Sequence, residues 1–158
     1  FSFLLPITFI LFIRRFGLIS SLSLPERRER IFPFMLISLI YLITAYIFWS
    51  LIERIYIDKR LFIIFLGIVL SLVLLSFITI FFKISAHSLA ISGILGGMFA
   101  FAQKNAEESF FVPMVLTAIF WGLVLAARLS LKAHSPKEVI WGSVAGFFIN
   151  FVFVSIFI

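Results

Sequence analysis

An arginine, a histidine and a carboxylate stand close together near residue 130, between two strongly apolar stretches. They are Arg128, His134 and Glu138. An imidazole can attack phosphorus, a carboxylate four residues further on can hold the correct tautomer of that imidazole, and a guanidinium can bind phosphate oxygens. The residue types and their spacing therefore point to phosphoryl-transfer chemistry.

Glu138 also has a purely structural explanation. Ser135, Pro136 and Glu138 form the S-x-x-E pattern of a capping box with proline at the first helical position, which predicts the start of a helix. A helix N-terminus favours an anion, so the same start would place His134 beside a phosphate-binding position. The two explanations of Glu138 are compatible, and the sequence leaves both open.

A second polar group, running from Lys83 to Ser88, separates two other apolar stretches. His87 would serve as a general acid, because an imidazole titrates near neutral pH. Lys83 and Ser85 would hold phosphate oxygens. A lysine at a membrane edge and a serine that caps a helix explain these two residues about equally well.

A third group is the charge run from Pro25 to Arg30. Such a run is typical of a solvated loop or of contact with acidic lipid headgroups, and we favour that interpretation. The less favoured interpretation has Arg30, which is close to Pro33, reach into the phosphate site.

The composition predicts which environment surrounds these polar groups. The chain is 63% hydrophobic and only 13% charged, and it has no cysteine. Long apolar runs predict an integral membrane protein with one transmembrane domain over 1–158. In a soluble protein the net charge of +6 would suggest nucleic acid. Here the basic residues lie between apolar runs, so lipid headgroups or anionic substrates are the expected partners, and nucleic acid is not.

The elements that must position these groups are membrane helices. We expect an all-α polytopic bundle of six transmembrane helices, at about 1–13, 33–52, 61–82, 88–102, 111–127 and 139–158. The first run is short and starts with Phe rather than Met, so we expect residues before Phe1. Alternation places every candidate site residue on one face. That face is also richer in Lys and Arg, but phosphate ligands would bias the count, so the orientation stays open.

The sequence resembles the type 2 phosphatidic acid phosphatase (PAP2) family, which is related to the vanadium haloperoxidases. The family's third motif, S-R-x5-H-x3-D followed by two spaced glycines, is matched from Ala127-Arg128 through His134 and Glu138 to Gly142 and Gly146. The second motif, P-S-G-H, is matched loosely by residues 84–87, and the resemblance spans most of the chain.

The chain departs from the family pattern at several positions. Glu138 replaces the aspartate and Ala127 the serine of the third motif, and Ile84 and Ala86 replace the proline and glycine of the second. The first motif, K-x6-R-P, has no proper match, because residues 27–33 are only a suggestive basic stretch.

The resemblance implies a metal-independent lipid phosphatase without a cofactor. His134 would be the nucleophile and form a phosphohistidine, Glu138 would orient it, and His87 would protonate the leaving alkoxide and then activate water. The implied phosphate ligands are Arg128, Lys83 and Ser85, with Arg30 as the less favoured addition. The substrate would be a lipid phosphate or pyrophosphate. We expect a multi-pass integral protein of a bacterial inner membrane.

Two other functions compete with this one. A non-catalytic membrane subunit could keep a degenerate fold of this family and bind other proteins of a complex; the missing first motif favours it. A transporter or channel has little support, because the middle parts of the helices carry almost no ionisable groups.

Overall fold

The computed structural model describes residues 8, 11–12, 14–15, 27–56, 58–105 and 108–158. The regular elements of these residues are the helices α2 (Arg27–Ile55), α3 (Lys59–Phe81), α4 (Ala86–Asn105), α5 (Phe111–Ser130) and α6 (Pro136–Phe157), with a short 3-10 turn, η1 (Glu108–Phe110), before α5. The expected all-helical fold is thus confirmed for the described part of the chain. The helix predicted over 1–13 falls largely outside it.

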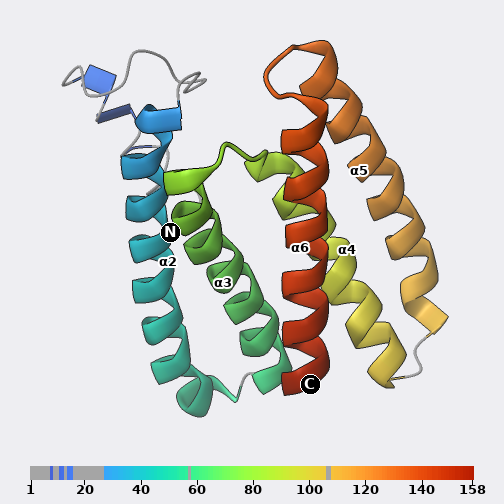
Figure 1. The fold of residues 1–158 in the computed structure, drawn as a ribbon. Helices are drawn as coiled ribbons and strands as arrows, with labels where there is room; N and C mark the ends of the chain where they lie inside the picture. Colours follow the sequence, from blue (N-terminus) through green and yellow to red (C-terminus); the bar gives the residue numbers. More distant parts are fainter. Residues whose placement is uncertain (1–7, 9–10, 13, 16–26, 57, 106–107) are drawn as a thin grey trace.

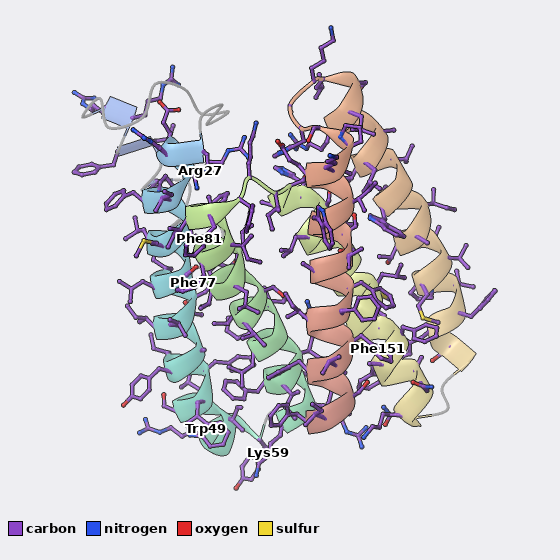
Figure 2. The ribbon with its side chains drawn as sticks, in the orientation of Figure 1. Arg27, Trp49, Lys59, Phe77, Phe81 and Phe151 are labelled. Atoms are coloured by element: carbon purple, nitrogen blue, oxygen red, sulfur yellow. The ribbon has the colours of Figure 1, made fainter. Side chains whose placement is uncertain are left out.

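Each of these five helices is long and apolar enough to cross a membrane. Side chains cover their outer surfaces, and many large apolar ones are exposed (Figure 2). A surface of this kind is suited to a hydrocarbon environment rather than to water. The chain is therefore an integral membrane protein.

The helices pack against one another to different extents. In Figure 1, α2 and α3 lie on one side of the bundle, α5 lies on the other, and α6 stands in front of α4. The most extensive packing is between α4 and α6. A Cβ atom built on Gly142 of α6 would lie 2.7 Å from the carbonyl oxygen of Ser85, and one built on Gly146 would collide with the carbonyl of Leu89. The two helices therefore approach backbone to backbone, as small residues permit in membranes.

The helix bounds differ from the predicted ones at the polar ends. The run that we favoured as a loop, from Arg27 to Arg30, forms the first turn of α2, and Pro33 lies inside the helix. Arginine and glutamate are good helix formers, and Arg30 is buried to 6% exposure, so packing holds this turn in place despite the proline. The fourth helix, expected over 88–102, extends over Ala86–Asn105 because Ser85 caps it.

The polar groups gather at one end of the bundle. The starts of α2, α4 and α6 lie together at that end (Figure 1). Trp49 and Lys59 lie at the opposite end from Arg27 (Figure 2). Leu75, Ile84 and Leu89 form a buried apolar cluster where α3, the α3–α4 connection and α4 meet. The predicted sorting of connections onto two faces thus holds for the described helices.

Candidate active site

His134 lies immediately before α6 and is held by the first turn of that helix. Its Nδ1 is 2.7 Å from Oε2 of Glu138. An ionised carboxylate can only accept a hydrogen bond, so Nδ1 donates to it, and in the neutral ring Nε2 then carries the lone pair. The hydroxyl of Ser135 meanwhile accepts the backbone N–H of Glu138 at 3.4 Å. The helix start thus orients the imidazole so that Nε2 is directed away from Glu138.

Arg30 faces Nε2 of His134 from α2. Its Nη1 is 3.5 Å from Nε2 of His134, although 104 residues separate the two in the chain. A guanidinium only donates hydrogen bonds, so the contact agrees with an unprotonated Nε2. The structure therefore places next to the histidine the arginine that the sequence left as a minor candidate.

The surroundings keep His134 in its neutral form. Burial lowers the pKa of His134 below its ordinary value, and the positive charges of Arg30 and Lys83 act in the same direction. The hydrogen bond to Glu138 and its negative charge oppose this shift without reversing it. A neutral imidazole with a free lone pair is the form that a nucleophile requires.

Lys83 and Ser85 approach Glu138 from the connection between α3 and α4. The Lys83 ammonium is 3.8 Å from Oε2 of Glu138. The backbone N–H of Ser85 donates to the carbonyl oxygen of Glu138 at 3.1 Å. The Ser85 hydroxyl is fully buried and accepts from the N–H and the hydroxyl of Ser88, at 3.3 and 2.9 Å. Ser85 thus caps α4 and joins its start to that of α6.

His87 and Arg128 complete the group. His87 is exposed in the first turn of α4 and interacts electrostatically with Arg128, His134 and Arg30. Arg128 is partly buried in the last turn of α5, and its charge also acts on Arg30. Four helices and two connections therefore bring all the predicted site residues to one end of the bundle.

An apolar cavity of about 750 Å³ opens from this end along α3 and α4. Of the predicted site residues, His87 lines this cavity. Asp58 and Arg60, which are not predicted site residues, line its far end. The cavity was not anticipated from the sequence, because it depends on how helices distant in the chain are spaced.

Sequence reasoning also missed two features of the site. It did not place Lys83 beside Glu138, and it did not place Arg30 on a helix. A signal for the helical position of Arg30 was present, because residues 26–32 contain no glycine or proline, and arginine and glutamate favour helix. No such local signal exists for the Lys83–Glu138 pair.

Comparison of the chain with models of protein families, with curated proteins and with solved structures finds no match.

Proposed function

We propose that this protein is an integral membrane phosphatase of the PAP2 type that hydrolyses a lipid phosphate or pyrophosphate through a phosphohistidine. One observation carries the proposal: Nδ1 of His134 is held by Glu138 at 2.7 Å while Nε2 is directed at the Arg30 guanidinium at 3.5 Å. A neutral, oriented imidazole facing a buried cation is suited to attack an anionic phosphorus centre.

The reaction would proceed in two displacements. Nε2 of His134 attacks phosphorus, the bond from phosphorus to the leaving oxygen breaks, and His87, in its protonated form, gives a proton to that oxygen. The leaving oxygen belongs to an alkoxide in a lipid phosphate and to the remaining phosphate in a lipid pyrophosphate. A water molecule then attacks the phosphohistidine and gives a proton to His87. Inorganic phosphate leaves, and both histidines return to their starting forms.

The cations would stabilise the charge of the transferring group. Arg30 now lies where the phosphate would approach Nε2, so its guanidinium would shift from the ring onto phosphate oxygens. Arg128 would approach the same oxygens from α5, and removal of one such donor typically costs about 10²–10³ in kcat. Lys83, close to Glu138 at 3.8 Å, would add positive charge at the edge. Ser85 would act mainly by positioning, because its hydroxyl caps α4.

The test is phosphate release from a panel of lipid phosphates and pyrophosphates by purified protein in the presence of EDTA. We expect His134→Ala to abolish release and to abolish an acid-labile covalent phosphate that wild type accumulates. Lys137→Ala is the matched control, because Lys137 is an exposed cation in the first turn of the same helix. It should retain wild-type rates.

Equal activity of wild type and His134→Ala would refute the mechanism. Absence of release by wild type across the whole panel would refute the enzyme and favour the non-catalytic subunit. In that case the protein should be recovered from its native membrane with other chains bound.

A further inference from the structure

A groove of about 470 Å³ between α2 and α3 opens to the outer surface of the bundle, and none of the described site residues lines it. Its lining runs from Phe32 to Leu42 on α2 and from Ile80 to Val73 on α3. At a rise of 1.5 Å per residue, the α2 lining spans about 15 Å. One leaflet of a bilayer contributes about 15 Å of hydrocarbon. The groove therefore has the length of a single leaflet, at the end of the bundle where α2 begins.

The polar atoms in the wall of this groove are already paired. Ser38 of α2 and Ser76 of α3 line it, and their hydroxyl oxygens are 2.7 Å apart. Each hydroxyl also lies 2.8 Å from a carbonyl oxygen of its own helix, that of Phe34 and that of Leu72. The serines thus join the two helices, and the groove presents an apolar surface.

The charge run at the start of α2 divides between two faces of the helix. Arg30 is buried and faces His134. Arg28 is exposed and stands four residues before Phe32. Residues four apart lie on the same face of a helix, so Arg28 continues the groove-lining face of α2 by one turn.

Arg27 reaches the same end of the groove. Its guanidinium donates a hydrogen bond to the carbonyl oxygen of Ile80, which lines the groove on α3. Figure 2 shows Arg27 close to the end of α3, beyond Phe81 and Phe77. A guanidinium has five N–H donors in a fork that matches phosphate oxygens, and this bond needs only one of them. Two cations therefore stand where the apolar groove meets the level of the lipid headgroups.

We propose that this groove binds an anionic phospholipid, with one acyl chain between α2 and α3 and the headgroup phosphate on Arg27 and Arg28. The groove matches a chain of one leaflet in length, and the two arginines supply the complementary charge. This lipid is distinct from a substrate, and the proposal does not depend on phosphatase activity.

Charge disfavours protein as the occupant. A second copy of the chain in a symmetric contact would bring its own Arg27 and Arg28 to this end. Residues 1–26 carry two arginines and one glutamate, so they too would add positive charge. An anionic headgroup neutralises the pair instead.

Quenching of tryptophan fluorescence by brominated lipids in reconstituted bilayers tests the proposal. Phe77 lines the groove and is 63% exposed, and Phe120 on α5 is 58% exposed away from it. Phe77→Trp and Phe120→Trp are made in a chain whose Trp49, Trp121 and Trp141 are replaced by phenylalanine. The measurement is the ratio of the association constants of brominated phosphatidylglycerol and brominated phosphatidylcholine at each reporter.

We expect this ratio to be about five or more at Phe77→Trp and near one at Phe120→Trp, because each cation at a membrane surface adds about a fivefold preference for anionic lipid. Arg27→Gln/Arg28→Gln should bring the ratio at Phe77→Trp close to one. Lys132→Gln/Lys137→Gln is the charge-matched control, since it removes two exposed cations from the α5–α6 connection and the first turn of α6. It should leave the ratio unchanged, as should added inorganic phosphate.

Equal ratios at the two reporters would overturn the proposal, and so would a ratio that Arg27→Gln/Arg28→Gln leaves unchanged. Loss of the preference on addition of inorganic phosphate would show a site for the free anion rather than for a lipid. Absence of quenching at Phe77→Trp by either lipid would mean that protein covers the groove, from residues 1–26 or from a second copy.

Native mass spectrometry gives a second reading that needs no reporter. At equal concentrations of the two lipids, the chain with its natural tryptophans should retain phosphatidylglycerol over phosphatidylcholine, and Arg27→Gln/Arg28→Gln should lose this preference. Equal retention of the two lipids by the unchanged chain would contradict the proposal even if the reporter chains failed to fold.

Discussion

Glu138 uses its backbone and its side chain for different purposes. Its N–H donates to Ser135 and its carbonyl accepts from Ser85, whereas its carboxylate bonds to His134 and lies near Lys83. The sequence allowed either a helix cap or an orienting group at this position. In the structure, the capping hydroxyl belongs to Ser135 and the carboxylate is turned to the histidine.

This division predicts different outcomes for two neighbouring substitutions. Glu138→Gln should lower kcat by about 10²–10⁴, because a neutral amide stabilises the tautomer and the imidazolium poorly. Ser135→Ala should lower the free energy of unfolding by about 1 kcal/mol with little change in kcat. Phosphate-release kinetics and thermal unfolding in detergent measure the two effects. Equal loss of kcat in both variants would mean that Glu138 acts only through the helix start.

At the residue scale, proximity in the chain decided what could be predicted. His134 and Glu138 are four residues apart at a helix start, so their contact followed from local rules. Arg30 is 104 residues from His134, and its position depends on how α2 packs in the bundle. No spacing rule predicts such packing. A charge run more often forms a solvated loop or contacts acidic lipid headgroups, so the sequence favoured that interpretation over a position of Arg30 in the site.

The α4–α6 pair is the element on which the site depends, because both helix starts carry site residues. Gly146→Ala should destabilise it by about 1–3 kcal/mol, since the new methyl group would meet the Leu89 carbonyl. Gly122→Ala, in open space on α5, should be neutral or stabilising. Thermal unfolding in detergent, followed by circular dichroism, compares them. Equal midpoints would contradict the close approach of α4 and α6.

The central parts of these helices were predictable from hydropathy, and their ends were not. Apolar runs of suitable length have few alternatives to a membrane helix. The polar ends can continue the helix or leave it, and tertiary contacts decide which. Burial of Arg30 extended α2, and the Ser85 cap started α4 earlier than expected.

At the scale of the whole molecule, the ends of the bundle differ in chemistry. Single cysteines can report this, because residues 1–158 contain none. Lys137 is exposed at the start of α6, and Lys104 is exposed at the end of α4. In sealed vesicles an impermeant maleimide should label only one of Lys137→Cys and Lys104→Cys, and should label the other after permeabilisation. Labelling of both in sealed vesicles would contradict the arrangement of helices across the membrane.

The hydrogen bonds of Glu138 separate the join between two helices from the contacts of a side chain. The bond that joins the starts of α4 and α6 uses the carbonyl oxygen of Glu138, and the bond that caps α6 uses its N–H. Any residue except proline supplies both groups. The side chain at this position can therefore be exchanged while the two helix starts stay joined, so the contacts to His134 and Lys83 can be removed without dismantling the end of the bundle.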